Sequence, residues 1–324
     1  MKLPAARGEL SATLIGALGQ DPERDRVVLP GDAGDADPFG DDVQLALFVA
    51  YELHYRGFDG VADAWEWHPE VLRLRGALER CFLAGLRAAV PGHTDLRATL
   101  DDLLVEPVES SGVSGFLKDE GELWQLREYA ALRSLYHLKE GDPHAYGIPH
   151  LTGRAKAGLV AVEYDEYGAG RADRMHQRLW AGLMADLGLA PAYGHYVEQG
   201  TAELLATVNL MSLFGLHRAL RGALVGHYAT VEITSSPASR RMTQAMERMG
   251  AGQAAIHFYA EHVEADAVHE QVMRHEVVGG LLEDEPELTD DVVFGVEATG
   301  LLEDRLAAAL TTPWRAGRTA LRTP

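Results

Sequence analysis

One stretch of sequence decides the predicted fold of this chain: Phe258-Tyr-Ala-Glu-His-Val-Glu-Ala-Asp-Ala-Val-His-Glu270. His262, Asp266 and His269 are separated by four and then three residues, so on an α-helix they form a single stripe. The plain alternative is a polar helix face whose histidines only contact solvent. Three potential ligands on one face favour the other interpretation, a helix that supplies metal ligands inside a helix bundle.

An earlier segment, Asp173-Arg-Met-His176, repeats the spacing of Asp266 and His269. A glutamate precedes each pair at a similar distance, because Glu140 lies 33 residues before Asp173 and Glu232 lies 34 residues before Asp266. The order of one glutamate followed by Asp-x-x-His therefore occurs twice, which is typical of a two-metal site between helices. Carboxylates mixed with imidazoles favour iron or manganese.

The two glutamates differ in their sequence surroundings. Glu232 lies in a mainly apolar stretch, and a buried carboxylate must be paired or must bind a metal. Glu140 ends a helical pattern, where it is either a ligand or an ordinary surface glutamate, and glutamates are mostly exposed. Its place in the duplicated order is what makes it a candidate ligand.

His176 has two candidate carboxylate partners. Asp173 is three residues away and shares a helix face with it. Glu166 is ten residues away, which leaves it about 80° out of alignment on a regular helix. Gly168 and Gly170 lie between them and would allow the helix to unwind, so that Glu166 and His176 both point inward. Local helix geometry favours Asp173, but the residues alone leave both partners open.

Composition excludes several other functions. The 324 residues are 47% hydrophobic, enough for a large core, and the net charge of -20 argues against nucleic acid or an anionic membrane as a partner. Cys81 is the only cysteine, so an intrachain disulfide or a zinc–thiolate site is impossible. The start lacks the apolar run of a signal peptide and no stretch is long enough to span a membrane, so we expect a cytoplasmic protein.

The helical pattern extends over nearly the whole chain, and no alternating pattern predicts a strand. We expect loops at 29–40 and 105–115, and a helix stop and restart at Thr234-Ser-Ser-Pro237. The predicted fold is all-α, with an N-terminal helical portion over residues 1–114 and a bundle of about seven core helices over 115–324. Helices are predicted at 43–55, 69–89, 116–140, 153–167, 171–187, 201–216, 219–233, 239–249, 253–281 and 290–310.

Taken together, these motifs resemble the heme-oxygenase-like di-iron oxidases and oxygenases, which are often described as iron-containing redox enzymes. The family pattern is a Glu, then a Glu and a His, then a further Glu, and finally His or Asp, x3, Asp, x2, His. The resemblance extends from about residue 115 to 285, and the last part of the pattern is its most specific match. It implies seven metal ligands: Glu140, Glu166, His176, Glu232, His262, Asp266 and His269.

The resemblance also implies a fold and an activity. It implies a heme-oxygenase-like bundle in which Glu166, rather than Asp173, accompanies His176. It implies two Fe(II) ions, O2 as a co-substrate, and oxidation of a small amine, amino acid or fatty acid. We expect a small-molecule substrate, no nucleic-acid or membrane partner, and a homodimer as the default assembly.

Three other functions fit a helical bundle. A ferritin-like protein for iron binding or storage also uses Asp-x-x-His pairs, although His262 is additional to that formula. A heme-binding helical protein would use one histidine as an axial ligand. A metal-independent thiaminase-like hydrolase needs a cysteine in the core, and Cys81 lies outside the region of resemblance. The histidines at 137, 144 and 150 lie in or near a segment rich in Gly and Pro, and we predict a mostly structural role for them.

Overall fold

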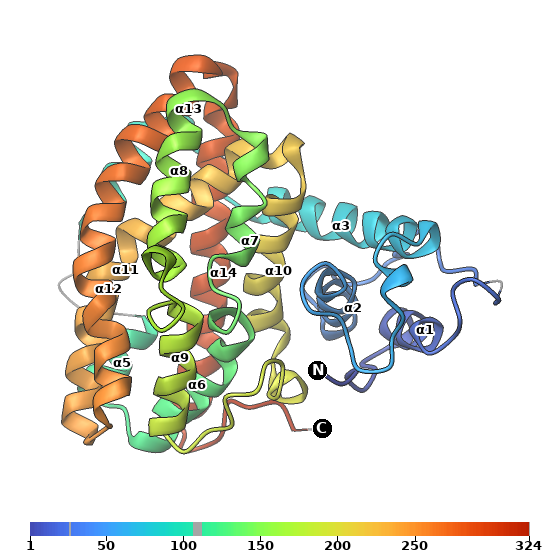
Figure 1. Cartoon of the computed structure of the whole chain (residues 1–324), viewed down its shortest axis with the longest axis horizontal. Helices are drawn as coiled ribbons and strands as arrows, with labels where there is room; N and C mark the ends of the chain where they lie inside the picture. Colours follow the sequence, from blue (N-terminus) through green and yellow to red (C-terminus); the bar gives the residue numbers. More distant parts are fainter. Residues whose placement is uncertain (26, 106–111, 324) are drawn as a thin grey trace.

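The computed structural model describes residues 1–25, 27–105 and 112–323, and these residues form helices and loops without a strand (Figure 1). This confirms the predicted all-α class. The helices are, in chain order, α1 (Glu9–Leu18), α2 (Asp41–Glu52), α3 (Pro69–Ala89), α4 (Leu96–Leu103), α5 (Val113–Asp119), α6 (Leu123–His137), α7 (Asp142–Ala145), α8 (Gly153–Glu166), α9 (His176–Asp186), α10 (Ala202–Leu216), α11 (Arg221–Met249), α12 (Gln253–Gln271), α13 (Gly279–Asp284) and α14 (Thr289–Arg315).

The long helices α11, α12 and α14 form the bundle together with α5, α6, α8, α9 and α10 (Figure 1). Helices α1, α2 and α3 lie beside this bundle, and α2 packs against α10. One continuous hydrophobic core links them, since it includes Val49 of α2, Leu205 of α10 and Leu306 of α14. The division of the chain at residue 114 stays a prediction.

Two glycines bring the backbones of α11 and α14 into contact. A Cβ on Gly226 of α11 would lie 1.9 Å from the carbonyl oxygen of Val292, and a Cβ on Gly295 of α14 would lie 2.1 Å from that of Ala223. Any side chain at either position would therefore force the two helices apart. This close approach fixes the middle of α11, the helix that carries Glu232.

The predicted break at Thr234-Ser-Ser-Pro237 is wrong, because α11 continues through Pro237. A proline inside a helix removes one backbone hydrogen bond and favours a kink. Here α12 packs along α11, and the Ser236 hydroxyl donates to the carbonyl of Val263 at 3.0 Å. Tertiary packing thus offsets a local signal to stop.

Other boundaries differ in ways that matter for the site. The predicted helix 116–140 divides into α5 and α6 and ends at His137, and the predicted helix 171–187 begins only at His176. The predicted helix 253–281 is helical throughout, but Val272–Val278 forms a wider π-helical turn, a feature that often accompanies functional sites. Residues 106–111 of the predicted loop 105–115 lie outside the described residues, and α5 begins at Val113, before the predicted end of that loop. Helices α1, α4 and α7 were not predicted.

Across the described residues, every helix is too short or too polar to cross a lipid bilayer.

Candidate metal centre

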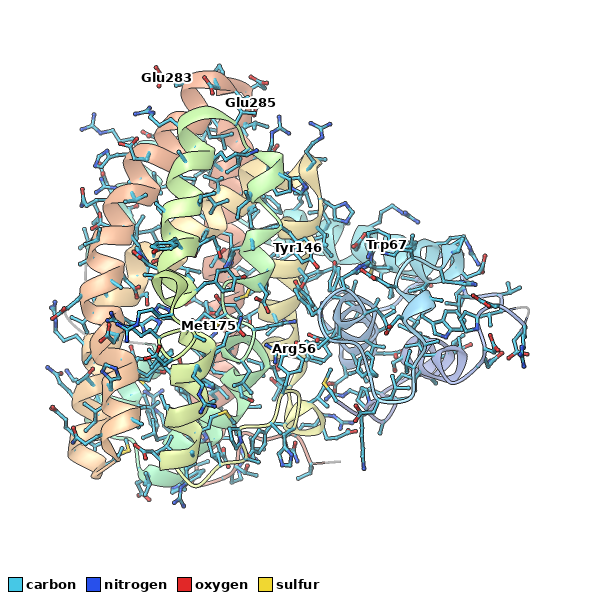
Figure 2. All side chains as sticks on the ribbon, viewed as in Figure 1. Arg56, Trp67, Tyr146, Met175, Glu283 and Glu285 are labelled. Carbon is cyan, nitrogen blue, oxygen red and sulfur yellow. The ribbon has the colours of Figure 1, made fainter. Side chains whose placement is uncertain are left out.

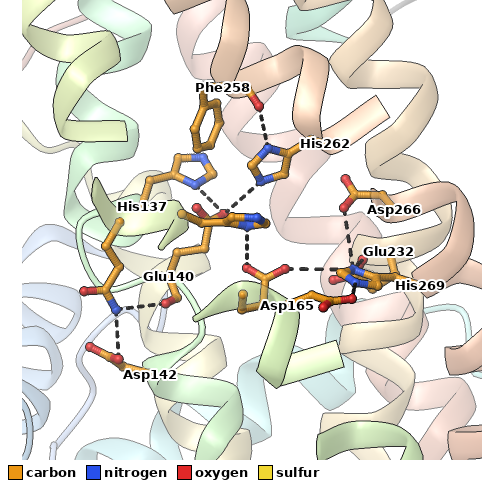
Figure 3. A network of polar contacts seen from close by, with 12 residues as sticks. His137, Glu140, Asp142, Asp165, Glu232, Phe258, His262, Asp266 and His269 are labelled. Atoms are coloured by element: carbon orange, nitrogen blue, oxygen red, sulfur yellow. Dashed lines mark hydrogen bonds and ion pairs between the residues drawn. The ribbon is translucent and has the colours of Figure 1, made fainter. Parts of the chain in front are cut away.

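The seven predicted ligands meet in the interior of the bundle (Figure 3). They come from helices α8, α9, α11 and α12 and from the turn after α6, yet each is only 2–6% exposed. Six of them form two groups whose ligand atoms all lie within 4.8 Å of one another. The first triad is Glu140, His176 and His262, and the second triad is Glu166, Glu232 and His269.

The first triad has an imidazole nitrogen directed at it. His262 Nδ1 lies 2.7 Å from the carbonyl oxygen of Phe258, one turn earlier on α12, and donates its proton there. This hydrogen bond leaves His262 Nε2 as the unprotonated nitrogen of the neutral ring. Nε2 is buried without a hydrogen-bond partner among the described residues and lies 4.0 Å from Glu140 Oε1. It is therefore suited to bind a cation.

The second triad is denser. His269 Nδ1 lies 3.2 Å from Glu232 Oε2, and 3.7 Å from Oδ1 of Asp266, which accompanies this triad. The other ring nitrogen of His269, Nε2, lies 3.2 Å from Oδ2 of Asp165, a half-exposed residue that the sequence did not single out. Asp165 lies directly before Glu166 in the sequence, so the sequence pointed to this part of the chain but did not predict that Asp165 contacts His269.

Glu166 connects the two triads. Its Oε2 lies 2.8 Å from His176 Nδ1, and its Oε1 lies 3.9 Å from His269 Nδ1. By contrast, the side chain of Asp173 is 73% exposed and pairs with Arg171 at 3.3 Å. Of the two candidate partners that the residues left open, Glu166 is the one that lies beside His176.

The backbone between α8 and α9 explains this arrangement. Gly168, Ala169 and Gly170 all have positive φ angles, 69°, 52° and 79°, so the helix ends at Glu166 and restarts at His176. At Gly168 a Cβ would also lie 2.6 Å from the backbone nitrogen of Met175, which leaves room only for glycine. Because the helix is interrupted, the 80° mismatch of a regular helix does not apply.

Glu140 lies in the turn that follows α6. Oε1 of Glu140 lies 2.7 Å from Nδ1 of His137, the last residue of α6, so His137 contacts the centre although we predicted a mostly structural role for it. The spacing of three between them was the available signal. His144 belongs to neither triad, and its Nε2 lies 3.1 Å from that of His227. Glu163, one turn before Glu166, is a further carboxylate with 2% exposure that the sequence did not select.

Burial perturbs the acid–base chemistry of the carboxylates. Desolvation raises the pKa of Glu140 to about 7, although His262 opposes it. Burial, and then repulsion from Asp266, raise the pKa of Glu232 to about 8, and burial raises that of Asp266 to about 7. In all three cases the largest cause is burial, which disfavours the charged carboxylate and which a bound cation would offset.

The histidines and Glu166 respond differently. Burial opposes the charged form of His176 and His269, but the carboxylates beside them outweigh it and raise the two pKa values to about 10 and about 9. Burial also disfavours charged Glu166, yet His176 lowers its pKa to about 2. Burial lowers the pKa of His262 to about 4, so this ring is neutral at pH 7.

The donor set fits a redox-active metal. Each triad offers at least one carboxylate oxygen and at least one imidazole nitrogen, a mixture that suits iron or manganese and not calcium. Glu140 Oε2 and His262 Nε2 are buried without hydrogen-bond partners among the described residues, as expected for atoms reserved for a cation. Cys81 lies on α3, outside this cluster, with its thiol 3.6 Å from the Ala36 carbonyl oxygen.

A cavity of about 510 Å³ borders the centre. It is lined by residues of α9, α12, the end of α8 and the segment between α8 and α9. His176 of the first triad lies in its wall, as does Asp165, the residue that contacts His269. Arg174 and Glu261, paired at 3.7 Å, add charges of both signs. The cavity wall therefore includes one ligand of the centre and one residue that contacts a second ligand.

The fold and this interior cluster define an all-α, heme-oxygenase-like bundle with two groups of potential metal ligands. The model of one family, described as iron-containing redox enzymes, matches residues 127–304, which is more than half of the chain and includes both triads. The chain therefore belongs to the iron-containing redox enzyme family, as the sequence motifs indicated. Its class is that of an oxidoreductase, and its two triads are compatible with iron. Comparison with curated proteins gives no match.

Proposed function

We propose that this protein is a non-heme di-iron oxidase or oxygenase that uses O2 to oxidise a small organic substrate. One observation carries the proposal: in each of two buried triads the ligand atoms lie within 4.8 Å of one another, and the two oxygens of Glu166 face one triad each. Glu140, His176 and His262 would hold one ion. Glu166, Glu232 and His269 would hold the other, with Asp266 beside them.

Charge balance supports two divalent ions. The four carboxylates among the seven side chains carry a formal charge of −4 when they are all ionised, which two Fe(II) ions would neutralise. Burying such charges is costly unless they are paired or bind a metal. When bound, the two ferrous ions would supply the electrons that activate O2.

Other groups of the protein orient the ligands and keep water away from them. The Phe258 carbonyl holds the Nδ1 proton of His262 and keeps Nε2 available. Asp165 contacts His269 from the cavity side and orients that ring. The low exposure of all seven ligands excludes bulk water, which strengthens every electrostatic interaction in the centre and limits side reactions.

The cavity lining favours a small polar substrate. Arg171 and Arg174 offer guanidinium groups that could bind a carboxylate, and Asp165 and Glu261 could bind an ammonium group. A fatty acid chain would instead need an extended apolar wall. Among the substrates implied by the resemblance, we therefore propose an amine or an amino acid. Homodimer assembly and a cytoplasmic location stay predictions.

The test is an anaerobic titration of the metal-free protein with Fe(II). We expect two irons per chain and an absorbance change on exposure to O2. His262→Ala and His269→Ala should each lose one iron, by removal of a ligand from different triads. His257→Ala is the matched control, because His257 is on the same helix but its side chain is 54% exposed. Absence of iron binding by the unmodified protein, or an equal loss in all three variants, would reject the proposal.

A further inference from the structure

A second buried ionic cluster lies outside the metal centre. Glu52, the last residue of α2, forms an ion pair with Lys139, and both residues are 0% exposed. The hydroxyl of Tyr193 donates to Glu52 Oε2 at 2.5 Å, and Lys139 Nζ lies 3.9 Å from the centroid of the Tyr55 ring. A buried pair is weak evidence for stability, because desolvation offsets the attraction. The pair does, however, fix the position of Lys139, the residue directly before Glu140.

Hydrogen bonds from other elements also hold the residues on both sides of Lys139. Arg56 donates to the carbonyl of Leu138 at 2.8 Å and to Oε1 of Gln177 at 3.0 Å. Gln177 in turn donates to the carbonyl of Glu140 at 3.0 Å. Figure 2 labels Arg56 where the bundle meets the N-terminal helices. Three consecutive residues, 138–140, are thus anchored from outside their own helix.

Such anchors matter because Glu140 is not inside a helix. Helix α6 ends at His137, and the amide of Glu140 reaches the carbonyl of His137 only at 3.4 Å. At the next position Gly141 has φ 85°, a left-handed conformation that turns the chain away. The position of the Glu140 carboxylate therefore depends on contacts of the turn with other elements.

We propose that Glu52 and Lys139 are positioning residues that hold Glu140 at the first triad. Through this pair, the helices before residue 114 set the geometry of the metal centre, which gives the N-terminal portion of the chain a function. The consequence for iron rests on the proposed function, because it requires Glu140 to be a metal ligand. The anchoring of the turn by Glu52 and Lys139 does not depend on the proposed function.

The test uses the full chain with the double change Glu52→Gln and Lys139→Met. Removing both charges leaves no unpaired buried charge, so the fold is preserved. The matched control is the double change Glu79→Gln and Arg75→Met, since Glu79 is also a buried carboxylate beside α2 and pairs with Arg75 at 3.2 Å. Lys139→Arg, which retains the charge, should behave more like the unmodified protein.

Two measurements separate anchoring from folding. In the metal-free protein, amide hydrogen exchange over residues 138–142 should accelerate roughly tenfold in the double variant and not in the control. In the Fe(II) titration, the site that is lost in His262→Ala should weaken about 10–100-fold, as is typical when the support of a ligand is removed. The site that is lost in His269→Ala should keep its affinity.

The outcomes are distinct. Unchanged exchange over 138–142 would overturn the proposal whatever the iron result. Equal weakening of both sites together with a lower unfolding temperature would also overturn it, because that is the signature of a merely structural pair. If the unmodified protein binds no iron, the proposed function fails, and the exchange measurement still decides whether the pair anchors the turn.

Discussion

Replacing Glu166 with glutamine should weaken both metal sites at once. Glu166 is the residue whose two oxygens face different triads, at 2.8 Å from His176 Nδ1 and 3.9 Å from His269 Nδ1. Glutamine keeps the size and shape of the side chain but lacks the negative charge. The change therefore tests the ligand role of Glu166 without creating a cavity.

The expected magnitudes follow from this position. Loss of a residue that only supports a ligand typically costs 10–100-fold in metal affinity. Loss of a ligand itself should cost at least about 100-fold for each ion, or about 2.7 kcal/mol. In the metal-free protein, His176 lowers the pKa of buried Glu166 from 4.5 to about 2, which corresponds to about 3 kcal/mol of stability. A carboxylate whose pKa is lower in the folded protein stabilises the fold at any pH above its pKa in the unfolded chain. The loss of stability in Glu166→Gln should therefore be measurable at pH 7.

The assay is an anaerobic Fe(II) titration against a competing chelator, with urea unfolding of the metal-free protein at pH 7. Asp173→Asn is the control, because Asp173 is exposed and pairs only at the surface with Arg171. Its stability should change by no more than about 0.5 kcal/mol and its iron affinity should be unchanged. The reasoning is refuted if Asp173→Asn loses iron while Glu166→Gln keeps both ions, or if Glu166→Gln loses only one.

Three further predictions concern stability. The metal-free protein should become less stable in urea unfolding from pH 6 to pH 9. Burial raises the pKa values of Glu232 and Asp266 to about 8 and about 7, and the stability that these groups contribute when protonated is lost as the pH rises through those values. Fe(II) at about 100 times its Kd should add about 2.7 kcal/mol per site, measured as a higher anaerobic thermal midpoint that a chelator reverses. Gly226→Ala should cost about 3 kcal/mol in urea unfolding by contact with Val292, whereas Gly300→Ala, which meets open space, should gain up to about 1 kcal/mol.

The sequence predicts the features that depend on local spacing. Helix α3 begins and ends at the predicted residues 69 and 89, since Pro69 favours the first turn and apolar residues repeat at helical intervals. His262, Asp266 and His269 share the buried face of α12 for the same reason. Periodicity is sufficient wherever a helix is regular.

The sequence predicts less well where the helix is interrupted or supported from a distance. Glu166 and His176 come together because Gly168 to Gly170 adopt left-handed backbone angles, and spacing alone favoured Asp173 instead. Pro237 indicated a stop that packing against α12 overrides. The pair of Glu52 and Lys139 joins residues 87 positions apart, and a single sequence contains no signal for such a pairing.

These differences divide the centre into two kinds of ligand. Glu232 and the three ligands of α12 lie inside helices, where backbone hydrogen bonds on both sides hold them in place. Glu140, Glu166 and His176 lie at helix ends, where glycines, Gln177 and the Glu52–Lys139 pair determine their positions. Among the seven ligands, His176 is the one in the cavity wall, so the ligand that an entering molecule meets lies at the end of a helix. We therefore expect substrate binding to move the helix-end ligands first, because helix ends are held by fewer backbone hydrogen bonds than helix interiors.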